Sequence, residues 1–187
     1  MSDLTTRVEE DIWTWIKEYV EVNHAFYGNS FPPCPYAKAA RLKGAIDIEV
    51  YESGNIEEFI KTNLQNLIDQ KDKKITQRAL ILPPRTKWRF GLIRFLNNLN
   101  VNIISQNYYM QFGQAIKTKS QYPGLFNSGP YFIILINVLS EVLDGHKALL
   151  STDYYKPWSK EHYNAVVGRR QEMYEKYGKK EEDSSNM

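Results

Sequence analysis

The stretch that decides the fold is residues 45–82, AIDIEVYESGNIEEFIKTNLQNLIDQKDKKITQRALIL. At its start, residues 45–50 alternate apolar and acidic side chains, a pattern that predicts a half-buried strand. At its end, residues 78–82 form a short apolar run that stops at Pro83 and Pro84 and predicts an internal strand. The residues between the two strands have a helical pattern, so the predicted order of elements is strand–helix–strand. This order is typical of α/β domains with right-handed crossovers.

The helix between the two strands has a clear start and a clear apolar face. Asn55 is a good N-cap, and Glu58, three residues further on, gives a start that resembles a capping box. Apolar residues then recur at helical spacing, at Ile56, Phe59, Ile60, Leu64, Leu67 and Ile68. We expect this face to pack on the sheet, with Asn63 at its edge.

The sequence on both sides of this stretch predicts further elements. Before it, apolar residues recur every four positions and indicate an amphipathic helix over 3–22, at Val8, Ile12, Ile16 and Val20. After it, we expect a third strand over 101–109 and helices over 88–99, 131–143 and 160–177. The run from Phe132 to Ile136 is apolar enough to be a strand instead of the middle of a helix.

Together these elements predict a single α/β domain over residues 1–178. We expect a small, largely parallel sheet of three or four strands, with helices packed on it and helical extensions at both ends. Residues 179–187 are polar and charged, and we expect them to form a disordered tail.

Composition places the chain in the globular class. Its 187 residues are 42% hydrophobic and 25% charged, and no segment has the character of a signal peptide or a membrane span. The net charge of +2 is too small to indicate nucleic-acid binding by itself. A lone cysteine excludes an internal disulfide and suits a reducing cytoplasm, and three scattered histidines give no basis for a metal site. We therefore expect a cytoplasmic protein with no metal and no cofactor.

A second informative stretch is residues 31–41, FPPCPYAKAAR, which contains the single cysteine, Cys34. The prolines favour an extended approach that ends where a helix begins. A helix start would lower the pKa of the thiol through its unpaired backbone N–H groups, helped by Lys38 and Arg41. Cys34 is therefore a candidate catalytic thiol, with Tyr36 lining its site. The alternative is a small apolar residue buried beneath the turn, where burial raises the pKa.

A histidine precedes the cysteine closely enough for a folded-back loop to bring the two side chains together. A pair of His24 and Cys34 would be a thiol with an adjacent base. The alternative is a solvated loop histidine. His24 is therefore counted among the candidate binding residues.

Two resemblances start from the cysteine. Residues 34–37, Cys-Pro-Tyr-Ala, resemble the glutaredoxin active-site motif Cys-Pro-Tyr-Cys with its second cysteine replaced, which implies a monothiol site without an intramolecular disulfide. The chain also resembles a family of small bacterial and phage proteins of unknown function. The matching pieces are the same Cys-Pro-aromatic-Ala motif and the runs 45–51 and 122–139. This second resemblance implies an α/β fold and leaves the activity open.

A basic segment follows the second predicted strand. Arg85, Lys87 and Arg89 stand beside Trp88 at the carboxyl end of that strand, where ligands of α/β folds gather. These residues could hold a phosphate, a carboxylate or a nucleic-acid backbone, with the indole stacked on a base. The alternative is the solvent-facing side of the helix over 88–99.

Two functions from different classes are compatible with these observations. The first is a small accessory or binding protein, encoded by a phage in one interpretation, whose partner is a protein, a small anionic ligand or, with less support, nucleic acid. The second is a thiol-dependent protein that uses Cys34 as a monothiol or a nucleophile. No acid/base pair or cofactor fingerprint identifies an enzyme, so the first is favoured. Whether the protein is an enzyme and what its oligomeric state is both stay open.

Overall fold

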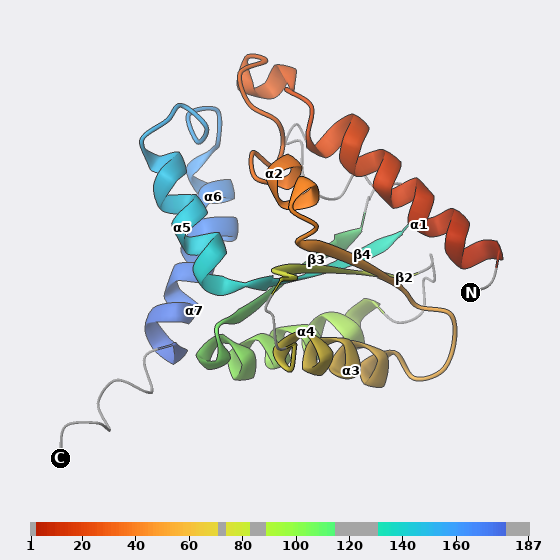
Figure 1. Ribbon diagram of the computed structural model, residues 1–187. Coiled ribbons are helices and arrows are strands. Elements are labelled where there is room, and N and C mark those ends of the chain that lie inside the picture. The colour runs from red at the N-terminus through yellow and green to blue at the C-terminus, as the bar shows by residue number, and fades with distance from the viewer. Residues whose placement is uncertain (1–2, 71–73, 83–88, 115–130, 179–187) are drawn as a thin grey trace. The chain divides into compact units, whose positions relative to one another are not determined.

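The computed structural model describes residues 3–70, 74–82, 89–114 and 131–178 (Figure 1). The chain divides into two compact units, each with an apolar cluster of its own. Unit 1 is formed by Met1–Lys87 and Gln111–Asn137, and unit 2 by Trp88–Met110 and Val138–Met187.

Most of a four-stranded sheet belongs to unit 1, with strand order β1-β2-β4-β3. The strands are β1 (Ile46–Val50), β2 (Gln77–Leu82), β3 (Tyr108–Gln114) and β4 (Phe132–Val138). β1 and β2 are parallel, as expected, whereas β4 runs antiparallel to β2. The α/β fold class is therefore confirmed, but the sheet is mixed rather than largely parallel.

β4 also corrects the helix that was expected over 131–143. The chain forms a strand through Val138 and only then enters helix α5 (Leu139–Leu150), so the alternative interpretation of Phe132–Ile136 as a strand is confirmed. β4 lies between β2 and β3, and most of its residues are buried. A strand covered on both faces is apolar at nearly every position, which removes the alternation that distinguishes strands from helices.

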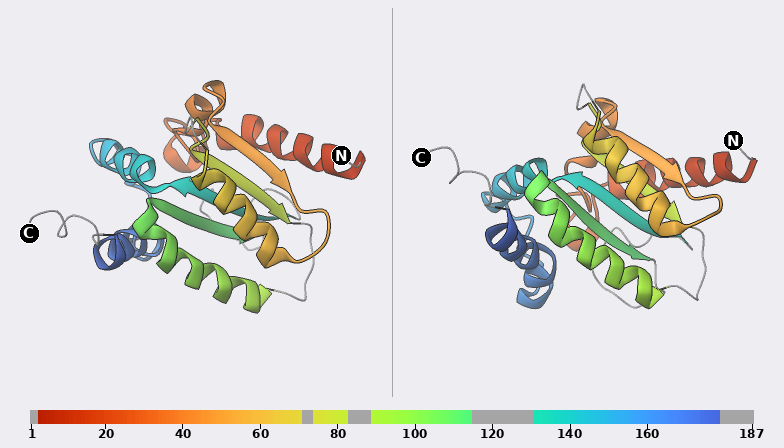
Figure 2. Two further views of the ribbon diagram at one scale, coloured as in Figure 1. Left: turned by 60° about the horizontal axis from the view of Figure 1, so that its bottom comes forward. Right: turned by 90° about the horizontal axis from the view of Figure 1, so that it is seen from below.

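Helices cover both faces of the sheet in unit 1. On one side lie α1 (Asp3–Trp15), its π-helical extension η1 (Ile16–Val20) and α2 (Ala37–Leu42), while α3 (Ile56–Ile68) lies on the other (Figure 1). Viewed from below, α3 runs alongside β1 and β2 (Figure 2). The 3-10 helix η2 (Ala25–Tyr27) forms part of the connection between η1 and α2.

One apolar cluster of unit 1 lies on the α1 side of the sheet. The apolar stripe predicted on the first helix is buried at all four positions, so that assignment is confirmed. It packs against alternate residues of three strands: Ile48 from β1, Ala79 and Ile81 from β2, and Ile133 from β4. Cys34 and several partly buried aromatic residues border the same cluster.

On the other face of the sheet, α3 packs through apolar side chains and through a polar cluster that includes Asn63 and Arg78. The Asn55 side chain caps α3 by accepting from the N–H groups of Glu57 and Glu58, as its sequence predicts. The prediction that Asn63 lies at the edge of the apolar face is wrong, because Asn63 is 7% exposed. Its side-chain amide donates to the Phe59 carbonyl at 3.0 Å, and its Oδ1 accepts from Arg78 Nη1 at 3.5 Å. The same Nη1 donates to the backbone carbonyl of Asn63 at 3.0 Å. A buried asparagine is tolerated there because its polar atoms are hydrogen-bonded.

Unit 2 is mainly helical. Its elements are α4 (Arg89–Ile103), the 3-10 turn η4 (Ile104–Gln106), the first residues of β3, α5, α6 (Lys160–Tyr163), the π-helical turn η5 (Asn164–Gly168) and α7 (Arg169–Tyr177). The last three form one continuous helical stretch, and the Ser159 side chain caps it by accepting from His162 N–H at 3.1 Å. The cluster at its centre is Ile104, Tyr109 and Leu139, with Leu143, Met173 and Tyr177 packed against it.

The strand expected over 101–109 is wrong for most of its length. α4 continues to Ile103, and β3 begins only at Tyr108. The helix expected to end at residue 99 continues because the Asn100 side chain is buried and bonds both the N–H and the carbonyl of Met110, at 2.7 and 2.9 Å. Because both polar ends of the Asn100 side chain are hydrogen-bonded, the residue can be buried within α4, and the helix continues past it.

The helices that the structure describes include none that is both long enough and apolar enough to cross a membrane. The tail expected over 179–187 lies outside the described residues.

Candidate functional site

β1 is the last strand in the order, so among the described strands none pairs with its outer side. Just after β1, the N–H of Tyr51 donates to the Ile81 carbonyl of β2 at 2.9 Å. Residues of a strand direct their backbone groups to alternate sides, so the N–H and C=O groups of Ile48 and Val50 point away from β2. Within the described parts of the chain, the structure records no hydrogen-bond partner for these groups.

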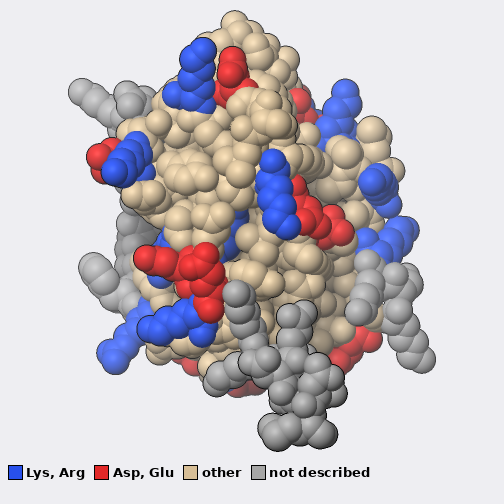
Figure 3. Space-filling view, turned by 90° about the vertical axis from the view of Figure 1, so that its left-hand side faces the viewer, with Lys and Arg blue, Asp and Glu red and all other residues tan. Residues whose placement is uncertain are grey.

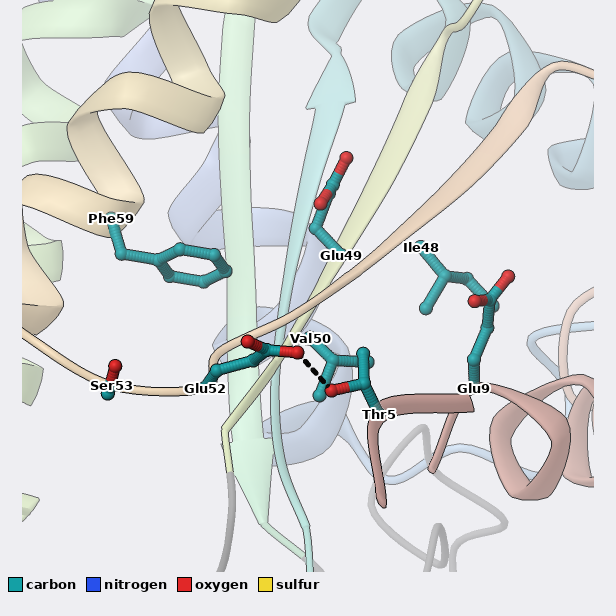
Figure 4. Close-up of a pocket in the computed structure, with 8 residues that line it drawn as sticks. All are labelled: Thr5, Glu9, Ile48, Glu49, Val50, Glu52, Ser53 and Phe59. Atoms are coloured by element: carbon teal, nitrogen blue, oxygen red, sulfur yellow. Dashed lines mark hydrogen bonds between the residues drawn. The ribbon is translucent and has the colours of Figure 1, made fainter. Parts of the chain in front are cut away.

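A groove with a volume of about 620 Å³ runs along this side of β1. Its lining residues come from α1, from β1 and the turn that follows it, and from α3, and all are labelled in Figure 4. Glu49 and Phe59 lie to one side of β1, and Ile48 and Glu9 lie to the other (Figure 4). The groove therefore has an exposed strand edge as its floor and a helix on each side.

The lining carries three carboxylates, on Glu9, Glu49 and Glu52. The Thr5 hydroxyl donates a hydrogen bond to Glu52, which ties the start of α1 to the turn after β1 (Figure 4). Among the described residues, no three acidic, histidine or cysteine side chains come close enough together to hold a metal ion. The carboxylates are thus spread along the groove rather than gathered at one point.

Burial is the main cause of a raised pKa at Glu49. The neighbouring carboxylates of Asp47 and Glu9 raise this pKa further, while Arg78 lowers it. Arg78 is itself paired with Asp47, with its Nη2 2.7 Å from Oδ2. Glu49 is therefore a carboxylate that a further positive charge would stabilise in its ionised form.

Cys34 lies just before a helix, as expected, but burial raises the pKa of its thiol instead of leaving it lowered. α2 begins at Ala37 with Tyr36 as its N-cap, so the cysteine lies just before the helix. Burial against the α1 cluster raises the pKa of the thiol, and this effect outweighs the N–H groups of Tyr36 and Ala37, which lower it. Glu21 raises the pKa as well. The direction is the one expected for a structural cysteine.

The residues expected to assist the thiol are engaged elsewhere or exposed. Arg41 forms two hydrogen bonds to the Glu21 carboxylate, at 2.7 and 2.8 Å, so its charge is paired. Lys38 is exposed on α2, and Tyr36 is 40% exposed. His24 caps η2 by accepting from Phe26 N–H at 3.1 Å. The contacts of Arg41 and His24 are not with the thiol, whereas Tyr36 interacts with it through its backbone N–H.

We expect iodoacetamide to alkylate Cys34 more slowly in the native protein than in the unfolded protein at the same pH. The thiolate is the reactive form, and a raised pKa lowers its fraction. Alkylation rates measured from pH 7 to pH 10 give both midpoints, and Lys38→Ala should leave the native midpoint unchanged. A native midpoint below the unfolded one, raised by Lys38→Ala, would instead support a nucleophile.

The predicted basic segment falls largely outside the described residues, which include neither Arg85, Lys87 nor Trp88. Arg89 begins α4, and its side chain is not described. On the face of the molecule shown in Figure 3, basic and acidic side chains of the described residues are interspersed. A nucleic-acid surface is usually a patch or stripe of positive charge, which this face does not show among those residues.

Unit 2 contains a buried polar cluster that the sequence did not predict. The His146 ring lies between two hydroxyl groups, with Nδ1 3.0 Å from the Tyr155 oxygen and Nε2 3.3 Å from that of Tyr163. Arg170 is 4% exposed, and its Nε has no hydrogen-bond partner among the described residues. Burial and the nearby Arg170 both lower the pKa of His146. The cluster joins α5 to the helical stretch that ends unit 2.

We expect unit 2 to lose stability as the pH falls below about 6.5, the ordinary pKa of histidine. Because the folded pKa of His146 is lowered, the unfolded chain binds the proton first. The stability from neutral His146 is therefore complete above the unfolded pKa and is lost progressively below it. Thermal unfolding between pH 5 and pH 7.5 measures the effect. His146→Gln should reduce this dependence and leave the part that comes from His162, whose pKa burial also lowers. A slope unchanged in His146→Gln would contradict the prediction.

Fold and site together define an α/β protein with an acidic groove along an open strand edge. Comparison with protein-family models, with curated proteins and with solved structures found no match. The function must therefore be inferred from the geometry of the molecule itself.

Sequence reasoning did not find the groove. The alternating pattern placed Glu49 in a half-buried strand, and neither Glu49 nor Glu9 was a candidate site residue. The alternation of residues 46–50 is the signal that was present, since a strand with acidic residues on one face suits the edge of a sheet. What the sequence lacks is the position of α1 beside that edge.

Proposed function

We propose that the protein is a small accessory protein that binds a partner in the groove along β1. The observation that carries this proposal is a groove whose floor is a strand edge with backbone groups available for pairing. Exposed strand edges attract other chains unless they are blocked or covered, and several families of binding domains use them to recognise peptides. We place this activity in the cytoplasm, where a single cysteine stays reduced.

The chemistry of the lining supports binding rather than catalysis. The polar side chains of the groove are carboxylates and the hydroxyls of Thr5 and Ser53, and the Thr5 hydroxyl already donates to Glu52. Cys34, the strongest nucleophile candidate, is not among the lining residues, and burial raises its pKa. A thiol-dependent function therefore receives no support from the geometry.

The test uses the full chain, labelled with ¹⁵N, and a panel of synthetic eight-residue peptides that are basic, neutral or acidic. The amide signals of Ile48 and Val50 are expected to shift on addition of at least one peptide, because these N–H groups face the groove. Amides on the exposed side of α3, such as that of Asn66, serve as the reference. If no peptide of any charge moves the β1 signals, the proposed function is overturned.

A further inference from the structure

We infer that the groove takes an extended, basic segment of a partner protein, which pairs with β1 as an added fifth strand. This inference rests on the proposed function and specifies the chemistry of the partner.

The backbone of β1 determines the form of the occupant. Ile48 and Val50 each present one donor and one acceptor toward the groove, at the spacing of alternate residues in a strand. An extended chain presents its own donors and acceptors at the same spacing, whereas a helix uses its backbone groups internally. An extended segment is therefore the occupant that satisfies these groups, and the length of β1 suits about five residues.

The side chains of the groove determine the charge of the occupant. An added strand would direct successive side chains to the two sides of the sheet. On the α3 side it would meet the Glu49 carboxylate and the Phe59 ring, and on the α1 side the Glu9 carboxylate beside Ile48 (Figure 4). Lysine and arginine suit both places, because their stems cover apolar surface while their heads reach a carboxylate.

The same charges argue against other occupants. A second copy of the chain, paired edge to edge through β1, would bring two sets of carboxylates together, which is unfavourable. A nucleic-acid backbone would be repelled for the same reason. A metal ion needs converging ligands, and among the residues that the structure describes these carboxylates do not converge.

The test measures the affinity of the basic peptide, built from alternating lysine and threonine, by titration calorimetry. We expect the affinity to fall as salt rises, because the pairs at the groove are partly exposed. Glu49→Gln should weaken binding about two- to fivefold, as expected for removal of one partly exposed ion pair. Glu57→Gln, on an exposed position of α3, is the matched control and should leave the affinity unchanged.

Two backbone-methylated versions of the same peptide test strand pairing without changing the protein. One carries N-methyl groups on its lysines and the other on its threonines. In a paired strand only one of these sets of N–H groups faces β1, so one version should lose binding and the other should keep it. Equal effects of the two methylation patterns would overturn the strand-addition model.

The results of these experiments distinguish failure of the basic-partner inference from failure of the proposed function. If neutral or acidic peptides bind as well as the basic one and shift the β1 signals, the proposed function stands and the basic partner is overturned. If the protein alone dimerises through β1, so that the Ile48 and Val50 signals change with its concentration, the occupant is a second copy and the inference fails. If nothing binds and nothing associates, both proposals fail.

Discussion

Replacing Leu64 by alanine is expected to lower the free energy of unfolding by about 2–5 kcal/mol. Leu64 is 6% exposed on the face of α3 that covers β1 and β2, next to the fully buried Ile60 and Leu67. Truncation removes apolar contacts and leaves a cavity, and closely packed neighbours can fill it only in part. Urea unfolding followed by circular dichroism gives the difference as a shift of the midpoint at constant slope.

The matched control is Asn66→Ala, because Asn66 is exposed on the same helix. An exposed substitution in a helix interior is expected to change the stability by less than about 0.5 kcal/mol. Equal and small effects of the two substitutions would mean that α3 does not pack through the face assigned to it.

Arg78→Met is expected to cost about 1.5–3 kcal/mol, the range for hydrogen bonds to charged groups. The Arg78 side chain is 12% exposed and joins three elements: it bonds Asp47 on β1 through Nε at 2.9 Å, and the Asn63 carbonyl on α3 through Nη1 at 3.0 Å. Methionine keeps the apolar stem but removes all the donors. Because the Asp47 side chain is 32% exposed, water compensates part of the loss, which keeps the expected cost below that of a fully buried pair.

The control for this prediction is Lys61→Met, which removes the exposed ion pair between Lys61 and Glu58. Both side chains of that pair are more than half exposed, so its removal should cost less than about 0.5 kcal/mol. A double-mutant cycle of Arg78→Met with Asp47→Asn measures the coupling directly. A coupling near zero would show that the pair seen in the structure adds nothing to stability.

The elements that the sequence predicted well are those whose signal is local. The cap at Asn55, the alternation at 46–50 and the four-residue spacing of the first helix each depend on neighbours within a few positions, and each appears in the structure. Local signals of this kind follow from the geometry of one strand or one helix. They therefore do not require knowledge of the rest of the chain.

The predictions that failed depend on partners distant in the sequence. Asn63 was expected at the edge of a face, but its side-chain amide donates to the Phe59 carbonyl and its Oδ1 accepts from Arg78 Nη1 at 3.5 Å, which lets the side chain be buried. The helix over 88–99 was expected to end before Asn100, but Met110 satisfies the Asn100 side chain within a helix. In each case a tertiary contact removed the cost of burying a polar group, and the local pattern contains no trace of that contact.

In the candidate site, too, the sequence indicated the local features but not the contacts between distant residues. The segment before α2 has the local features that lower the pKa of a cysteine, but packing against the α1 cluster raises it. The groove combines Glu9 from α1 with Glu49 from β1, which are far apart along the chain. Proximity of this kind comes from the fold, so no spacing in the sequence could indicate it.

The position of β4 beside β2 has a consequence during protein synthesis. The ladder that joins the two strands includes the pair Gln77 and Asn137, which are separated by 60 residues. A ribosome that adds about 5–20 residues per second needs several seconds or more to cover that distance. Throughout this interval Leu80, Ile81 and Leu82, which are fully buried in the finished protein, lack the strand that covers one of their edges. Between the synthesis of these two strands the nascent chain therefore has an unpaired apolar strand edge, a feature that promotes aggregation.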